Sequence, residues 1–593
     1  MVNTLQEEKK SKKVHQSFAL GALIMAVGML IVKLAGAAFK IPLAYILGGV
    51  GQGYFNIAYS LYNPLYALAT AGLPIAISRM VAQNMTAKRY KDVRMIHKVS
   101  VPIFIFTGLI ATVLMIVGSP LCAKFTHSPG AIYSLLALSP TVLFSCLISI
   151  YKGYYEGLRN MIPTAVSEIV EAIGKVIFGV GLSAFVVWYG MNEYSLYGTV
   201  FGNYYESEAL AFDATLPFAS AGAVLGITLG SISGFIYIFL KYKLSGDGIT
   251  KKEIEESPEA HDRKKIVKML WSIATPIALG AIIMNLAGAI DAMLVQRRLS
   301  DIMNSTPDIL LKVYEGLIPG EVVGEGKTHN FLAGCFAYMS TITMLLPTIT
   351  QGFSISALPN VTTSWVKGVK SKIKSNIETV MKLTAIISFP MGIGMSVLSH
   401  PIMDLIYNTM GTSRKCEIFI SAEIMQLYAL ATILIAISTP ICGMLQAIGR
   451  ADLPLKILTI GMIMKVVLNY ILVGIPEINI QGAGIGTLVC YLFVCVSGII
   501  LLNREARIKV DLLAIIGKPL LCGLVCGAVA YLSHGLFIRF INPKLSTLIA
   551  ILLAAFAYLI ALFLFRAITY SDLSSIPKSK KIVKVLEKYH LLG

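Results

Sequence analysis

The sequence predicts an all-α, polytopic membrane protein with about fourteen transmembrane helices. Of its 593 residues, 56% are hydrophobic and only 14% are charged, whereas an average soluble chain is about 25% charged and 45–50% apolar. The mean hydropathy is +0.74. The apolar residues also gather in separate runs along the whole chain, which a single water-soluble core does not require.

Each predicted span has the roughly 20 apolar residues that a helix needs to cross the hydrocarbon layer. In the first half of the chain the spans are expected at 17–40, 53–79, 99–120, 131–151, 163–189 and 216–240. In the second half they are expected at 269–295, 331–357, 379–402, 421–446, 454–475 and 482–503. A final pair is expected at 512–533 and 546–566.

The distribution of basic residues predicts the orientation. The chain has 50 Lys and Arg against 32 Asp and Glu, and it contains no basic-aromatic module of the kind that binds nucleic acid. With an inside N-terminus, the inner segments hold 34 basic residues and the outer loops hold 10. Positive charge stays on the cytoplasmic side, so we expect a multi-pass protein of the cell membrane with both termini cytoplasmic and a first span that is retained.

An internal repeat divides the predicted spans into two sets. The run Leu34-Ala35-Gly36-Ala37 recurs as Leu286-Ala287-Gly288-Ala289. Further along, three residues recur at a constant offset of 290 positions: Gly153 as Gly443, Glu156 as Gln446, and Lys175 as Lys465. Six spans per copy is an even number, so the two copies are expected to be parallel repeats about an axis along the membrane normal.

The repeat gives the expected domain organisation. Two six-helix lobes are predicted, with a polar linker between them and two extra helices and a basic amphipathic tail after them. The ranges are 1–240 for the first lobe, 241–268 for the cytoplasmic linker, 269–503 for the second lobe, 504–570 for the extra helices and 571–593 for the tail. Two lobes of this kind suit alternating access, in which one rocks against the other. Because one chain contains both lobes, we expect a monomer.

Charged residues within membrane spans are rare and are candidate functional residues. Seven of the charged residues within the spans are selected as candidates, four lysines and three acids: Lys33, Lys40, Lys175, Lys465, Glu168, Glu171 and Asp291. The lysines are the candidate substrate-binding residues, since an ammonium binds phosphate as a point charge. The acids are candidates for binding a coupling ion, Na⁺ or H⁺, or for pairing with lysines. A structural Glu171–Lys175 pair and a Lys40 that reaches the membrane surface are the alternatives.

No cofactor or metal site is predicted. The chain contains no phosphate-binding loop, no dinucleotide motif and no HExxH sequence, and its cysteines lack metal-ligand spacing. We expect a transporter that is not an enzyme and that is driven by an ion gradient, the membrane potential or the substrate gradient.

Residues 30–82 carry a family resemblance. The run LIVKLAGAAFKIPLAYILGGVGQGYFNIAYSLYNPLYALATAGLPIAISRMVA resembles the start of the stage V sporulation protein B family, which belongs with polysaccharide exporters and lipid II flippases. These form the multidrug/oligosaccharidyl-lipid/polysaccharide flippase superfamily. The segments that match best are Lys33-x-x-Gly36, Lys40-Ile41-Pro42-Leu43-Ala44 and Ala71-Gly72-Leu73-Pro74.

The resemblance implies a function and an approximate site. It implies movement of an undecaprenyl-diphosphate-linked saccharide to the outer leaflet for peptidoglycan, spore cortex or polysaccharide assembly, with membrane lipids around the protein. In lipid II flippases, basic residues of the first two spans line the cavity. Lys33 falls at one such position and Lys40 close to another, whereas the position in the second span falls near the uncharged Tyr66.

Two other functions remain open from the sequence. A cation-coupled multidrug antiporter of the same superfamily would need acidic cavity residues to outnumber the basic ones, and here they do not. A membrane glycosyltransferase or ligase would need a catalytic group of carboxylates or histidines in an outer loop. The acidic loop at 190–215 lacks such a group.

Overall fold

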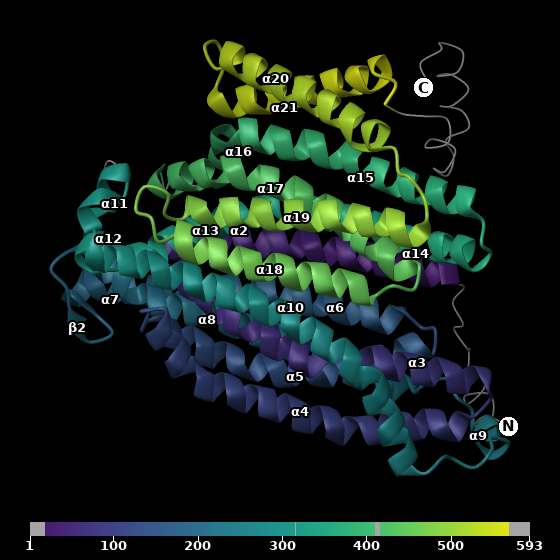
Figure 1. The fold of residues 1–593 in the computed structure, drawn as a ribbon. Helices are drawn as coiled ribbons and strands as arrows, with labels where there is room; N and C mark the ends of the chain where they lie inside the picture. Colours follow the sequence, from purple (N-terminus) through teal and green to yellow (C-terminus); the bar gives the residue numbers. More distant parts are fainter. Residues whose placement is uncertain (1–17, 71, 315, 409–414, 568–593) are drawn as a thin grey trace. The chain divides into compact units, whose positions relative to one another are not determined.

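The computed structural model describes the chain except for residues 1–17, 71, 315, 409–414 and 568–593. The predicted amphipathic tail at 571–593 therefore lies outside the described residues. Within the described ranges the protein is helical apart from one short hairpin, in which β1 (Thr199–Val200) pairs antiparallel with β2 (Asn203–Tyr204). Figure 1 shows the ribbon coloured along the sequence.

Among the described residues, twelve helices are long and apolar enough to cross a membrane. The all-α membrane class predicted from composition is therefore confirmed. The expected spans 17–40 and 53–79 correspond mainly to the two arms of α2 (Phe18–Thr70), which are two helices that meet at a kink at Gly48. They count once among the twelve. The intervening stretch 41–52 carries no charge, and Gly48 has φ 59°, a value that glycine adopts without strain.

Contacts within the chain divide it into two compact units. The first comprises Met1–Ser300 with Gly320–Gly334, and the second comprises Asp301–Pro319 with Cys335–Gly593. The expected domain ranges, with a boundary at 241–268, stay a prediction. Each unit is described by itself below.

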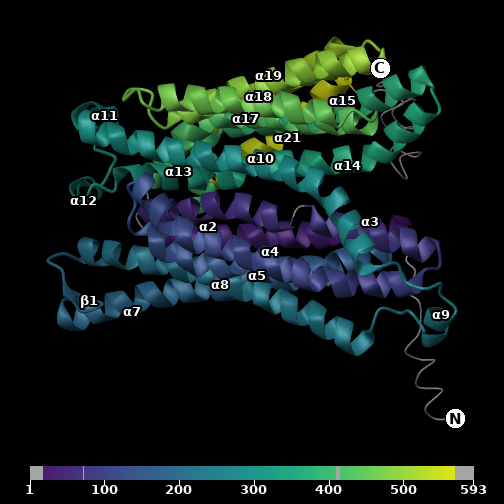
Figure 2. The same cartoon turned by 60° about the horizontal axis from the view of Figure 1, so that its bottom comes forward.

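The first unit follows α2 with a series of helices whose neighbours in sequence mostly pack together. α5 packs against α4 and α8, while α2 packs against α5 and α6. The hairpin lies between α7 and α8 (Figure 2). The bounds of these elements are α3 (Leu73–Thr86), α4 (Tyr90–Phe125), α5 (Ala131–Gly157), α6 (Ile162–Gly174), η1 (Lys175–Val180), α7 (Gly181–Tyr197), α8 (Glu208–Ser245), α9 (Lys251–Glu255), α10 (Arg263–Ser305) and α12 (Gly320–Gly324).

Glycines bring α8 into backbone contact with α6 and with η1, a π-helical turn. A Cβ atom added to Gly226 would lie 2.1 Å from the backbone of Gly179, and one added to Gly230 would lie 2.7 Å from the carbonyl oxygen of Glu171. Small residues are the usual means by which membrane helices approach this closely. This approach places the charged residues of α6 and η1 directly beside α8.

The second unit is built around α17, which packs against α14, α15 and α19. α20 and α21 pair with each other, and α20 also packs on α15. The bounds are α11 (Pro307–Val313), α13 (Thr328–Thr343, which starts in the first unit), α14 (Leu345–Val366), α15 (Lys370–Val397), α16 (Ser399–Tyr407), α17 (Lys415–Ala447), α18 (Asp452–Leu472), α19 (Gln481–Ala506), η2 (Leu513–Gly517), α20 (Lys518–Phe537) and α21 (Pro543–Leu564).

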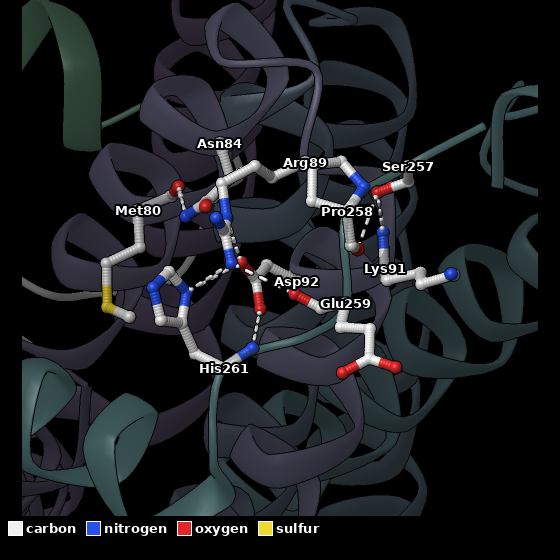
Figure 3. Close-up of polar contacts among 9 residues, drawn as sticks. All are labelled: Met80, Asn84, Arg89, Lys91, Asp92, Ser257, Pro258, Glu259 and His261. Atoms are coloured by element: carbon white, nitrogen blue, oxygen red, sulfur yellow. Dashed lines mark hydrogen bonds and ion pairs between the residues drawn. The ribbon is translucent and has the colours of Figure 1, made fainter. Parts of the chain in front are cut away.

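The segment between α8 and α10 is attached to the first unit by two carboxylates. At the start of α4, the buried Asp92 accepts hydrogen bonds from the Arg89 Nε–H at 2.5 Å and from the backbone N–H of His261 at 2.6 Å. Figure 3 shows that the His261 ring also faces Asp92. The Arg89 guanidinium reaches the carbonyl oxygen of Glu259 at 3.1 Å. The segment is thus held at its α10 end.

The second carboxylate holds the α8 end of this segment. Asp247 accepts hydrogen bonds from the Arg94 guanidinium, with Nε at 3.0 Å, and from the Tyr154 hydroxyl, also at 3.0 Å. Arg94 belongs to α4 and Tyr154 to α5. Both ends of the connection are therefore docked on the first unit, which is a more ordered arrangement than a polar linker sequence predicts.

We predict that Gly226→Ala destabilises the protein and that Gly181→Ala does not. The Gly226 substitution puts a methyl group against the Gly179 backbone, and overpacking of this kind costs about 1–3 kcal/mol. A Cβ added at Gly181 meets nothing within 4 Å. Thermal unfolding in detergent measures the difference, and equal melting temperatures for the two variants would contradict the close approach.

We also predict that Asp92→Ala exposes the segment between α8 and α10 to trypsin. Removing this buried acceptor leaves its donors unsatisfied, at about 1–3 kcal/mol, so cleavage should be about fivefold faster or more. Glu255→Ala, at an exposed position of α9, is the control and should cleave at the wild-type rate. Unchanged cleavage of the Asp92 variant would show that the docking contributes nothing to protection.

Candidate functional site

Four charged residues of the first unit form what we call the charge cluster: Lys152, Glu168, Glu171 and Lys175. The Lys175 Nζ lies 2.8 Å from the Glu171 Oε1, and the Lys152 Nζ lies 3.1 Å from the Glu168 Oε1. The Ser231 hydroxyl of α8 donates to the same Glu171 oxygen at 3.2 Å. Each lysine therefore has a carboxylate partner.

The local helix geometry brings these residues together. Glu168 and Glu171 lie on α6, while Lys175 begins the π-helical turn η1. Residues three and four apart share a helix face, which puts Lys175 over Glu171. Such π-helical turns occur frequently at functional sites. Lys152 approaches from α5 across the turn between the two helices.

The charge cluster is only partly buried. The exposed fractions of its side chains run from 17% for Glu171 to 31% for Lys175. The carboxylate of Glu156 lies within electrostatic range of Lys152 and Glu168. Two lysines thus face two or three carboxylates, and the cluster carries no net positive charge.

A ladder of tyrosines on α2 lies beside this cluster. Tyr59, Tyr62 and Tyr66 are spaced along one helix face, with ring centroids 5.8 Å and 5.4 Å apart. Tyr62 is buried, whereas Tyr66 at the end of the ladder is 38% exposed. Tyr59 and Tyr66 both lie within electrostatic range of Lys175. The ladder and the charge cluster therefore form one polar and aromatic region of the first unit.

Two of the predicted lysines do not belong to the charge cluster. Lys33 and Lys40 are exposed on α2, and neither forms a hydrogen bond or ion pair with any other residue that the structure describes. They are seven residues apart, which is two turns or about 10 Å along a helix, so they lie on the same face. Their charges lie within electrostatic range of each other.

The other predicted candidates lie elsewhere. Asp291 is buried in α10, and Lys465 is half-buried in α18 of the second unit. Both take part in further polar interactions. The structure thus groups Glu168, Glu171 and Lys175.

Lys152 is not among the residues predicted from the sequence, because it lies between the expected spans 131–151 and 163–189. The pairing has a signal in the sequence. Lys152 and Glu168 are each eight positions from Asn160, in the turn between α5 and α6. Residues equally distant from the turn of a helical hairpin tend to face each other. Ser231 gave no comparable signal, because serine is common in membrane helices.

The acidic segment at 190–215 is explained structurally. The Glu193 carboxylate accepts hydrogen bonds from the Thr199 hydroxyl at 2.9 Å and from the backbone N–H groups of Phe201 and Gly202 at 3.1 and 2.9 Å. It stabilises the turn of the β1–β2 hairpin. A carboxylate engaged in this way is a structural acceptor, which removes one candidate for a catalytic group in this loop.

Comparisons with known families cover almost all of the described chain. Residues 18–303 match the family described as polysaccharide biosynthesis protein, and residues 332–566 match the family described as lipid II flippase MurJ. The lipid II flippase MurJ of Bacillus subtilis is 21% identical over 90% of this chain and 92% of its own length. The stage V sporulation protein B of the same organism is 22% identical over 95% and 98%. The resemblance found in residues 30–82 is confirmed.

Solved structures show the same fold. A structure described as lipid II flippase MurJ in an inward closed conformation aligns with a TM-score of 0.57 and 16% identity, over 92% of this chain and 98% of the other. An inward-facing multidrug resistance MATE family transporter of the MOP superfamily aligns with a TM-score of 0.58 and 15% identity, over 82% and 98%. At these identities the alignments establish the fold and not the substrate.

We predict energetic coupling between Glu171 and Lys175. Glu171→Gln or Lys175→Met alone leaves a partly buried charge uncompensated. Each should cost about 1–3 kcal/mol, between the values for buried and surface pairs. The double variant should lose less stability than the sum of the two single changes.

A surface pair of the same spacing provides the control for this coupling. The Lys252 Nζ and the Glu256 Oε1 on the linker are 3.9 Å apart, and the two side chains are 84% and 66% exposed. The same comparison of single and double variants at this pair should therefore show no coupling. Thermal unfolding of both sets gives the comparison. Additive effects at Glu171 and Lys175 would show that the pair contributes no interaction energy.

Proposed function

We propose that this chain is a transporter of the multidrug/oligosaccharidyl-lipid/polysaccharide superfamily and that it carries a lipid-linked saccharide across the cytoplasmic membrane. The cargo would be an undecaprenyl-diphosphate-linked precursor such as lipid II or a related polysaccharide unit. The match of residues 332–566 to lipid II flippases and the full-length similarity to stage V sporulation protein B favour this class of cargo over a drug.

The contrast between paired and unpaired lysines carries the proposal. The cluster lysines Lys152 and Lys175 each contact a carboxylate. Lys33 and Lys40 form no ion pair with any described residue. The net positive charge on this part of the first unit therefore resides on α2. An anionic headgroup would be attracted there, and a cationic drug would be repelled.

The chemistry of a diphosphate suits two lysines on one helix face. An ammonium among apolar helices is costly without a counter-ion, and a phosphate oxygen supplies both the opposite charge and a charge-assisted hydrogen bond. Two long, flexible side chains on one helix face, two turns or about 10 Å apart, can reach the same headgroup. The diphosphate of the cargo would then supply the negative charge that no described residue provides to these lysines.

The transport cycle proposed here rests on the repeat. Fourteen spans, arranged as two parallel six-helix repeats with two added helices, would have both termini in the cytoplasm and would work by alternating access. A monomer is sufficient, since both repeats lie in one chain. The energy would come from an Na⁺ or H⁺ gradient, the membrane potential or the substrate gradient, and the product would serve peptidoglycan, spore cortex or polysaccharide assembly.

We predict that purified protein in liposomes moves lipid II between leaflets and that Lys33→Ala slows this movement about tenfold or more. A charge-assisted contact is worth about 1.5–3 kcal/mol, and Lys33→Glu should slow movement further because it repels the diphosphate. The readout is the fraction of lipid II that an added, impermeant enzyme can modify.

The matched control is Lys124→Ala, which removes an exposed lysine from the last turn of α4 and should leave the rate unchanged. Wild-type protein that moves no lipid II, but exports an organic cation in the same vesicles, would reject this cargo in favour of the drug antiporter. Full activity in both Lys33 variants would remove Lys33 from the substrate site.

A further inference from the structure

The region formed by the charge cluster and the tyrosine ladder differs chemically from the face that holds Lys33 and Lys40. We propose that this region binds the uncharged sugar rings of the cargo, while the unpaired lysines of α2 bind its diphosphate. The inference rests on the proposed function, and it assigns a saccharide subsite to Tyr66 and to the pairs Lys152–Glu168 and Lys175–Glu171.

The charges of the cluster disfavour a phosphate there. Each cluster lysine is within 3.1 Å of a glutamate oxygen, so a phosphate that approached an ammonium would also approach a carboxylate. Like charges in a partly dehydrated site repel strongly. With as many carboxylates as ammonium groups, or one more, the cluster cannot provide the net attraction that a diphosphate needs.

The cluster also keeps unused hydrogen-bonding capacity. An ammonium has three N–H donors, and the contacts of Lys152 and Lys175 each engage one of them with a carboxylate. A carboxylate accepts several hydrogen bonds through its two oxygens. The side chains are between 17% and 31% exposed, so donors and acceptors are both accessible. A sugar hydroxyl, which donates and accepts, matches such a mixed and neutral surface.

An aromatic side chain lies next to these polar groups. The Tyr66 ring is 38% exposed at the end of the tyrosine ladder, and Tyr62, which is buried, supports one side of it at 5.4 Å. The face of an aromatic ring is electron-rich and attracts the slightly positive C–H groups on the apolar face of a pyranose. A supported, half-open ring beside polar side chains is a suitable platform for stacking a sugar.

The charge at this end of α2 favours a neutral ligand as well. Tyr66 is uncharged, and the neighbouring lysines Lys152 and Lys175 are neutralised by Glu168 and Glu171.

The test compares the binding of two defined lipids by the full-length protein in nanodiscs. One is undecaprenyl diphosphate, and the other is lipid II, which adds the saccharide and its peptide. Tyr66→Ala and the double variant Lys152→Met/Glu168→Gln, which leaves the net charge unchanged, should each weaken lipid II binding about tenfold, a change of about 1.4 kcal/mol. Neither should alter the binding of undecaprenyl diphosphate. Lys33→Ala should weaken the binding of both lipids.

Two further variants separate a lost subsite from a damaged fold. Tyr66→Phe keeps the ring and should bind both lipids as the wild type does. Tyr531→Ala removes a 68% exposed ring from α20 and should also leave both affinities unchanged. Melting temperatures of all variants show which are folded.

The outcomes distinguish this inference from the function on which it rests. If Tyr66→Ala and the double variant weaken both lipids equally, or neither, the saccharide subsite is rejected while the proposed cargo stands. If Tyr66→Phe loses lipid II binding as Tyr66→Ala does, stacking is rejected as the mechanism. If the wild type binds neither lipid, the proposed function fails and the inference fails with it.

Discussion

The energetic cost of charge among apolar helices is the constraint on which the organisation of the first unit depends. A single ionised side chain at the centre of a membrane helix costs at least about 2.5–3.5 kcal/mol. The first unit reduces this cost in the charge cluster by placing Lys175 over Glu171 and Lys152 beside Glu168. The Ser231 hydroxyl donates a further hydrogen bond to Glu171. The packing of α5, α6 and α8 brings these side chains into contact.

The glycines of α8 make that arrangement sterically feasible. A side chain at Gly230 would collide with the carbonyl oxygen of Glu171 and the backbone nitrogen of Lys175, so the serine could not come within reach of the carboxylate. The π-helical turn adds to this effect, since it begins at Lys175 and ends beside Gly181. Packing therefore determines the polar contacts here, because the close approach of the helix backbones decides which polar groups come within hydrogen-bonding distance.

The sequence predicts the features that depend on local spacing and composition. The membrane class follows from composition, and the Glu171–Lys175 contact follows from a separation of four residues on a helix. The resemblance of residues 30–82 agrees with the family comparisons, which match residues 18–303 to polysaccharide biosynthesis proteins and residues 332–566 to lipid II flippases. Features that depend on chain geometry were harder to predict. The spans expected at 17–40 and 53–79 are the two arms of α2, but nothing in the uncharged stretch 41–52 indicates that a kink rather than a loop joins them.

Contacts between distant segments escaped prediction for a related reason. The docking of the linker depends on Asp92 and Asp247, which look like ordinary surface residues in the sequence. Their partners Arg89 and Arg94 are plentiful types in a chain with 50 basic residues. Only the fold reveals that Asp92 is buried and that His261, 169 residues later, completes its hydrogen bonds.

The same residue type therefore has two roles in the first unit, and its partner determines which role it has. A lysine with a carboxylate partner stabilises helix packing and contributes no net charge. A lysine without one retains its attraction for an anion. Lys33 and Lys40 precede the kink of α2 at Gly48, and Tyr66 follows it. The two kinds of surface thus lie on separate arms of one helix, so a change in the bend at Gly48 alters the distance between them. A cargo with an anionic and a neutral part would contact both arms, so a change in the bend would alter both contacts together.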